Sequence, residues 1–234
     1  MEIPLFLAIS PQEMASCATP PKNTAWLSCH FSEEGAGLED IPISLPENSF
    51  LIIDDSAPIC NHDPALVSEQ MKETVLRHRC KGVLLDFQRP HNERAEKIIR
   101  QICRLPCPVG VSEPYAAGLD CPIFLPPIPV DCSPKEYLKK WKGREIWLDT
   151  SYSPTRIVIT ANGCAVHQTP LTDTPLPHRD DRLCCHYSIS TSENQIIFLV
   201  QRTQEDIYAL MKKSIPFGAT HAFGLYQELA DSVR

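Results

Sequence analysis

The sequence lacks several features that would place it in a common functional class. It has no run of about 18 apolar residues, so no membrane-spanning helix is predicted. Lys and Arg number 22 against 29 Asp and Glu, and the resulting net charge of −7 argues against a nucleic-acid-binding protein, which needs a basic face. Neither a G-x-G-x-x-G nor a P-loop pattern occurs. We therefore predict no nucleic-acid partner, no membrane association and no cofactor.

Metal-ligand spacings are also missing, although cysteine is abundant. None of the 11 Cys forms a C-x-x-C pair, and zinc sites need ligand pairs that are closer and repeated. No metal site is predicted, and the cysteines are interpreted as reduced thiols of a cytoplasmic protein. The opening residues MEIPLFLAIS carry no basic leader and only a short apolar run, so a signal peptide is not expected.

What the sequence does contain is a series of short apolar runs bounded by its 22 prolines. Continuous apolar runs are typical of parallel strands buried on both faces. They predict strands over residues 4–9, 25–30, 50–54, 82–87, 108–112, 122–125, 144–149 and 220–226. Capping residues followed by apolar periodicity predict helices that begin after Asp63, Asn92, Ser133 and Thr203.

The alternation of strands and helices predicts a parallel α/β fold. Residues 155–201 break the alternation with two hairpin patterns, one of them a type I′ turn signal at Asn162-Gly163. We predict a compact, irregular (β/α)8 TIM-like barrel, with some helices replaced by loops and an antiparallel β insertion before the last helix. The predicted units are barrel strands one to seven in 1–151, the insertion in 152–201 and the last helix and strand in 202–234. An open doubly wound sheet is the alternative.

Polar side chains follow most of the predicted strands where each strand ends. In chain order they are His30, Asp54, Asp55, Asp86, Gln88, Arg89, Glu113, Asp149, Tyr226, Gln227 and Glu228. Because the C-terminal ends of barrel strands meet at one face, we expect these side chains to share one rim. Crowded carboxylates raise one another's pKa, which lets one act as an acid at neutral pH. The alternative is that each acid only caps a helix or turn.

The candidate roles depend on residue type. Asp86 is the most informative position, because it ends the buried run Val83-Leu84-Leu85. We predict Asp86, Glu113 and Glu228 as catalytic candidates, with Glu113 or Glu228 as general acid or base and Asp86 as its electrostatic partner. The remaining rim residues are predicted to bind substrate: Gln88, Arg89, His30, Asp54, Asp55, Asp149, Tyr226 and Gln227.

One stretch of the chain resembles a known family. The segment Lys81-Gly-Val-Leu-Leu-Asp-Phe-Gln88 is similar to the fourth strand of family-18 glycoside hydrolases, whose signature is D-G-x-D-x-D-x-E. Gly82, Asp86 and Phe87 match the family's glycine, last aspartate and aromatic residue. The other three acidic positions differ: Lys81 and Leu84 replace the first two aspartates, and Gln88 replaces the catalytic glutamate. The family also carries an insertion between strand seven and the following helix. The motif covers residues 64–112, and beyond them the resemblance is one of architecture only.

The resemblance implies a carbohydrate-directed function that lacks the usual acid. In the family the glutamate protonates the glycosidic oxygen and the substrate's own N-acetyl group attacks, outside the two-carboxylate scheme. An amide such as Gln88 has no labile proton to give. We therefore expect a saccharide or small polar ligand at the strand-end rim, bound or hydrolysed through Glu113 or Glu228. The alternative is a non-enzymatic interaction module that binds a protein by strand addition to the β insertion. The oligomeric state is left open.

Overall fold

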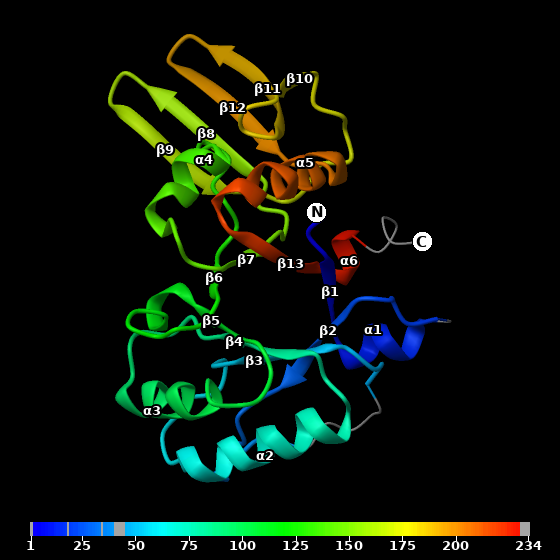
Figure 1. Cartoon of the computed structure of the whole chain (residues 1–234). Helices are drawn as coiled ribbons and strands as arrows, with labels where there is room; N and C mark the ends of the chain where they lie inside the picture. The colour runs from blue at the N-terminus through cyan, green and yellow to red at the C-terminus, as the bar shows by residue number, and fades with distance from the viewer. Residues whose placement is uncertain (1, 18, 34, 40–44, 230–234) are drawn as a thin grey trace.

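The structure is a computed structural model of the chain and describes residues 2–17, 19–33, 35–39 and 45–229. Eight parallel strands close into a barrel in the order β1-β13-β7-β6-β5-β4-β3-β2 (Figure 1). They are β1 (Leu5–Ile9), β2 (Thr24–Cys29), β3 (Phe50–Asp54), β4 (Gly82–Asp86), β5 (Val109–Ser112), β6 (Ile123–Leu125), β7 (Ile146–Asp149) and β13 (Ala219–Leu225). The predicted TIM-like barrel is confirmed. An open sheet is excluded because β1 pairs with both β2 and β13.

The inside of the barrel is filled by side chains rather than left as a pore. Alternate residues of each strand point inward. The inward residues form one buried cluster of Phe6, Ala8, Ala25, Phe50, Ile52, Leu84, Phe124, Trp147 and Phe223. Within it, the rings of Phe50 and Trp147 meet edge to face with their centroids 5.2 Å apart. Because these rings block the interior, a ligand can reach the barrel only at its mouth, the end where the C-termini of the eight parallel strands meet.

One glycine makes room for this aromatic packing. A Cβ atom added at Gly110 on β5 would overlap the indole of Trp147, which is fully buried. The strand therefore needs a residue without a side chain at this inward position.

We expect Gly110→Ala to lower the free energy of unfolding by about 1–3 kcal/mol, as overpacking of a dense core does. Urea unfolding followed by tryptophan fluorescence measures the effect. Adding Trp147→Phe, which vacates part of the same space, should recover some of the loss in a double-mutant cycle. Strictly additive effects would show that the two residues do not compete for that space.

Helices cover the outside of the barrel unevenly. They are α1 (Pro11–Ser16), α2 (Pro64–Arg77), α3 (Glu93–Ile102), α4 (Pro134–Leu138), α5 (Gln204–Ser214) and α6 (Tyr226–Leu229), with 3-10 turns η1 (Glu113–Tyr115), η2 (Lys139–Trp141) and η3 (Ile215–Phe217). The four predicted helix starts are confirmed, each with its capping side chain bound to a backbone N–H of the first turn. Within the described residues between β2 and β3 there is no helix.

Helices α1 and α6 were not predicted. Helix α1 begins with Ser10-Pro11-Gln12-Glu13, a capping box in which the Ser10 hydroxyl and the Glu13 carboxylate bond to each other's backbone N–H. Ser133-Pro134-Lys135-Glu136 has the same form and predicts the start of α4. The box at Ser10 does not by itself predict a helix, because few apolar residues follow it, and only Met14 of α1 is buried.

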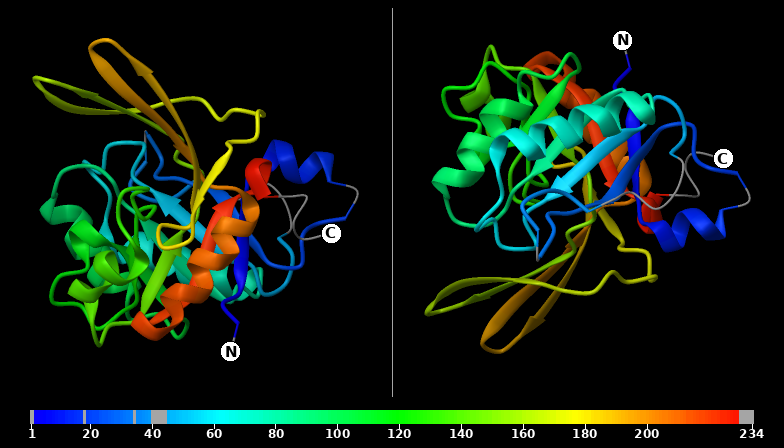
Figure 2. Two further views of the ribbon diagram at one scale, coloured as in Figure 1. Left: turned by 90° about the horizontal axis from the view of Figure 1, so that it is seen from above. Right: turned by 90° about the horizontal axis from the view of Figure 1, so that it is seen from below.

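The segment between β7 and α5 forms a second, antiparallel sheet, as predicted. Its strands run in the order β10-β11-β12-β8-β9. They are β8 (Thr155–Thr160), β9 (Gly163–Gln168), β10 (His178–Asp180), β11 (Cys185–Ser192) and β12 (Gln195–Gln201). The β8–β9 and β11–β12 hairpins extend beyond the barrel in both views of Figure 2.

The type of the first hairpin turn was predicted wrongly. Thr160 pairs with Gly163, so the two loop residues are Ala161 and Asn162. A type I′ turn needs positive φ at both. Among the described residues other than glycine, only Asn48, Arg79 and Cys184 have positive φ. Gly163 therefore starts β9 and is not a turn residue, which moves the turn one position earlier than Asn162-Gly163 suggested.

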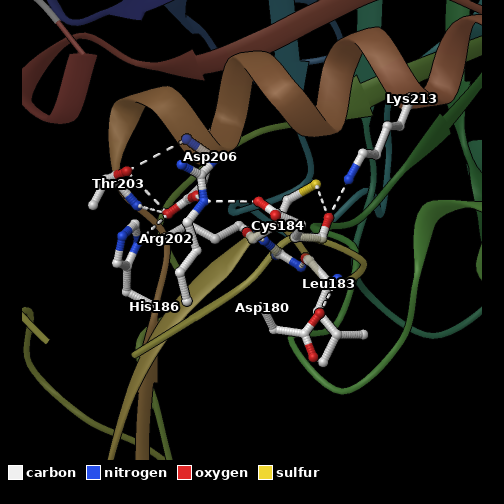
Figure 3. A network of polar contacts seen from close by, with 10 residues as sticks. Asp180, Leu183, Cys184, His186, Arg202, Thr203, Asp206 and Lys213 are labelled. Atoms are coloured by element: carbon white, nitrogen blue, oxygen red, sulfur yellow. Dashed lines mark hydrogen bonds and ion pairs between the residues drawn. The ribbon is translucent and has the colours of Figure 1, made fainter. Parts of the chain in front are cut away.

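A buried polar network fastens this sheet to the barrel (Figure 3). Arg202, only 5% exposed, donates from its guanidinium to four backbone carbonyls, those of Ile128, Pro129, Leu183 and Cys184. Nearby, the fully buried Asp206 of α5 accepts from the backbone N–H and hydroxyl of Thr203 and lies 2.7 Å from Nδ1 of His186 on β11. The network thus joins the β6 loop, the β10–β11 turn and the start of α5.

Candidate active site at the barrel mouth

The strand-end aspartates separate into inward and outward side chains. Asp54, Asp86 and Asp149 each come two residues after an inward core residue, namely Ile52, Leu84 and Trp147. The two-residue period of a strand therefore points all three into the mouth. Asp55 follows Asp54 directly and points the other way.

Two of these aspartates share a small cavity in the mouth. Asp86 and Asp149 line it together with Ser151, and its volume is about 60 Å³. The rest of the lining is apolar or backbone: Ala8, Leu27, Ile52, Leu84, Phe124, Phe223, Gly224 and Leu225. The cavity thus offers two acidic groups above an apolar floor. It can hold one substituent of a ligand that rests on the rim.

Asp86 is held by two donors. The Gln88 side-chain amide donates to Oδ1 of Asp86, and the Ser112 hydroxyl donates to the same atom at 3.3 Å. Burial raises the pKa of Asp86, while these two hydrogen bonds oppose the shift. Gln88 is itself exposed, so its amide is available to a ligand on the rim. Asp86 and Gln88 thus act as one unit at the end of β4.

Asp149 is bonded by a single residue, Ser151, through its backbone N–H and its side chain, and its pKa is shifted further than that of Asp86. The backbone N–H of Ser151 donates to Oδ1 of Asp149 at 2.8 Å. Burial raises the pKa of Asp149 to about 6, and the nearby charge of Asp86 adds to the effect. A carboxyl group with this pKa carries a proton in part of the molecules near neutral pH, which makes it a candidate acid.

The other acids of the rim are engaged elsewhere. Asp55, 4% exposed, accepts the backbone N–H groups of Gln88 and Arg89 at 2.9 Å each, so it holds the turn after β4. Asp54 lies 3.0 Å from Nδ1 of His30 at the edge of the mouth. Glu113 forms an ion pair with Lys140 at 3.1 Å. Neither Asp55 nor Glu113 lines the cavity that holds Asp86 and Asp149.

The residues predicted after the last strand lie on α6. Glu228 accepts the backbone N–H of Tyr152 at 2.7 Å, and burial raises its pKa, with the charge of Asp149 adding to the shift. The hydroxyl of Tyr226 lies 3.1 Å from the thiol of Cys17. Gln227 is exposed. Glu228 is therefore close enough to Asp149 to influence it, although it does not line the cavity.

Arg89 lies outside the mouth. Its guanidinium donates to the carbonyl of Ser56, and together with Asp55 and Tyr115 it lines a separate cavity of about 180 Å³ beside the first turn of α3. The structure thus brings Asp86, Asp149 and Gln88 together, places His30, Asp54 and Glu228 around them, and turns Arg89, Asp55 and Glu113 away.

Two serines of the mouth were not predicted as site residues. Ser112 ends β5 and Ser151 follows β7, and each bonds to one of the two cavity aspartates. The pattern Asp149-Thr-Ser151 is the spacing at which an Asp side chain accepts the N–H two residues on, so it was recognisable. Ser112 lies two residues after Gly110, which occupies an inward position of β5, so the Ser112 side chain also points inward. That direction follows from the closed barrel and not from the sequence.

Other features of the mouth limit what it can bind. Among aromatic residues that would stack on a sugar, Trp26, Trp147 and Phe87 are fully buried in the core. Within the described part of the chain, no group of three or more His, Cys, Asp or Glu residues is arranged to hold a metal ion, Asp54, Asp55 and Asp86 included.

No helix among the described residues is both long and apolar enough to cross a membrane.

Comparison with solved structures finds the same architecture elsewhere. The spore cortex-lytic enzyme SleL of Bacillus cereus superposes with a TM-score of 0.55 over 95% of this chain and 70% of its own, at 10% sequence identity. SleL of Bacillus megaterium gives a TM-score of 0.54 over the same shares, at 7% identity. The likeness establishes a TIM-like fold. At such low identity it says nothing further about activity.

Comparisons of the sequence itself find no match, either among family models or among curated proteins. The resemblance to family-18 glycoside hydrolases therefore continues to rest on the motif around Asp86 and Gln88. The position of the insertion, between β7 and α5, agrees with that resemblance.

Proposed function

We propose that this chain is a carbohydrate-directed barrel protein that binds a saccharide or glycoconjugate at the mouth of the barrel. The observation that carries the proposal is the convergence of Asp86 and Asp149 on one cavity with an apolar floor. Sugars combine hydroxyl and amide donors with apolar faces, so they suit a site of this composition. Support also comes from the fold, which is shared with two enzymes named for lysis of the spore cortex.

The small size of the cavity favours a ligand with a compact substituent. An acetamido group would place its methyl on the apolar floor and donate its N–H to Asp86, which accepts hydrogen bonds already from Gln88 and Ser112. The sugar ring itself would rest on the rim beside Gln88. N-acetylglucosamine oligomers are therefore the first ligands to test.

Asp86→Asn is expected to abolish saccharide binding and leave the fold intact, because the amide keeps the shape but loses the charged acceptor. Titration of the labelled protein with N-acetylglucosamine oligomers and a wider oligosaccharide panel, followed by NMR shifts, measures this. Asp63→Asn is the matched control, since Asp63 only caps α2 and Asn caps equally well. Unchanged binding by Asp86→Asn, or no saturable shift at the mouth with any sugar, would refute the proposal.

One observation favours hydrolysis as a second candidate function. The pKa of Asp149 is raised to about 6, so this group can protonate a leaving oxygen near neutral pH, which Gln88 cannot do. Glu228 is the next candidate, because burial raises its pKa as well. The same NMR sample followed for hours would reveal new reducing-end signals. Saturable binding without such signals restricts the function to recognition.

A further inference from the structure

The two edges of the insertion sheet differ in how well they resist pairing with another strand. One edge is β10, which is only three residues long and reads His-Arg-Asp. Short, charged edge strands are the usual protection against edge-to-edge association. The other edge is β9, in which all six residues, Gly-Cys-Ala-Val-His-Gln, are exposed. It contains no Pro, Lys, Arg, Asp or Glu, and its pairing with β8 shows no bulge. Strand β9 is thus an unprotected edge.

The register of the β8–β9 hairpin shows which backbone groups of β9 are available. A two-residue loop makes its closing pair, Thr160 and Gly163, a hydrogen-bonded pair, and such pairs alternate along the ladder. Ala165 and His167 therefore bond to β8. Cys164, Val166 and Gln168 direct their N–H and C=O groups outward.

These outward groups are complementary to a second copy of themselves. In an antiparallel pair centred on Val166, Val166 faces Val166 of the other copy and Cys164 faces its Gln168, so each outward N–H meets a C=O. The intervening residues place Ala165 opposite His167. No like charges oppose one another across this pair. At its centre, the Val166 side chain, which is 61% exposed in one copy, is covered by Val166 of the other copy.

The low charge of the hairpin allows a second copy to approach there. The whole chain carries a net charge of −7, so two copies repel each other over most of their surfaces. Residues 155–168 contain no carboxylate, and Arg156 is their one Lys or Arg. The hairpin also extends away from the barrel in both views of Figure 2, so two copies can join without contact between the barrels.

We propose that two copies of this chain associate through antiparallel pairing of their β9 strands about a twofold axis at Val166, joining the two insertion sheets into one. This isologous contact closes on itself and stops at the dimer. It is independent of the saccharide site and requires no change in the barrel.

Sedimentation equilibrium over a range of concentrations tests the proposal on the full chain. The native protein should approach twice its mass of 26.3 kDa as concentration rises. Val166→Pro removes an outward N–H without removing a bond to β8, and should weaken dimerisation by more than about tenfold. Ile159→Thr is the matched control: it removes a similar exposed apolar side chain, 40% exposed, from β8, which is paired on both sides. This control should dimerise as the native chain does.

A covalent test fixes the register. In a hydrogen-bonded antiparallel pair the facing Cα atoms lie about 5.5 Å apart, within disulfide range. Val166→Cys, in a Cys164→Ser background, should therefore be linked by oxidised glutathione. The two thiols lose two protons and two electrons to the glutathione disulfide, which is released as two reduced molecules. Ile159→Cys in the same background should stay unlinked.

Three results would overturn the proposal. The native chain could remain a monomer at every concentration, Val166→Pro could dimerise as strongly as the native chain, or Ile159→Thr could abolish association as fully as Val166→Pro does. The last result would indicate packing through the sheet face rather than the edge. Circular dichroism of each variant verifies that its fold is retained.

Discussion

Arg202→Met is expected to lower the free energy of unfolding by about 3–5 kcal/mol, the usual cost of breaking a buried charged network. Arg202 is 5% exposed, and its guanidinium donates to carbonyls from two separate segments, the loop after β6 and the β10–β11 turn. Burial lowers the pKa of Arg202, because the charged guanidinium is held away from water. Removing the guanidinium leaves these buried carbonyls without hydrogen-bond donors.

Urea unfolding measures this prediction, and Arg156→Met on the same sheet provides its control. Arg156 is exposed on β8, so its replacement should change stability by less than about 0.5 kcal/mol. Arg202→Lys should recover only part of the loss, because an ammonium cannot reproduce the planar fork. A loss below about 1 kcal/mol for Arg202→Met would show that water replaces the guanidinium and that the sheet is attached by other contacts.

Asp149→Asn is expected to make the protein more stable at neutral pH. The pKa of Asp149 rises from 3.8 to about 6 on folding, because burial disfavours its charged form. A raised pKa contributes stability below pH 3.8, and that contribution is lost as the pH rises through about 6. The ionised side chain therefore costs about 2–3 kcal/mol at pH 7.5, at 1.36 kcal/mol per pH unit. The variant should gain that amount at pH 7.5 and almost nothing at pH 4.

This result would separate an acid kept for function from one that serves the fold. Urea unfolding at both pH values measures it, and Asp55→Asn is the matched control. The Asp55 carboxylate accepts two backbone N–H groups, one on each oxygen, and an amide can accept only one of them. Asp55→Asn should therefore lose about 1–2 kcal/mol at neutral pH. A loss of stability for Asp149→Asn at pH 7.5 would mean that its charge supports the fold.

The two carboxylates of the cavity and their unequal partners are central to the proposed saccharide site. Asp86 accepts hydrogen bonds from the side chains of two residues, Gln88 and Ser112, while Asp149 is bonded by one residue, Ser151, through its backbone N–H and its side chain. Two neighbouring carboxyl groups in unlike surroundings commonly divide into a charged and a protonated partner. In the mouth, Asp86 can accept a hydrogen bond from a ligand, and Asp149 can hold a proton.

The sequence by itself determined the barrel and the insertion. Apolar runs located the strands because each strand is buried on both faces, and capping residues such as Asp63 and Thr203 located the helix starts. These signals are local, since each depends on a few neighbouring residues. Strand ends then indicated where polar groups would gather.

Only the tertiary structure decided which of those polar groups form a site. Asp54 and Asp55 are adjacent in sequence, yet one faces the mouth and the other holds the turn after β4. The Glu113 carboxylate accepts a hydrogen bond from Lys140, which lies 27 residues away in the sequence. Arg202 showed no sequence signal at all, because its partners are backbone carbonyls up to 74 residues away. Such choices depend on the register at which the barrel closes, and that register is set by contacts between distant parts of the chain.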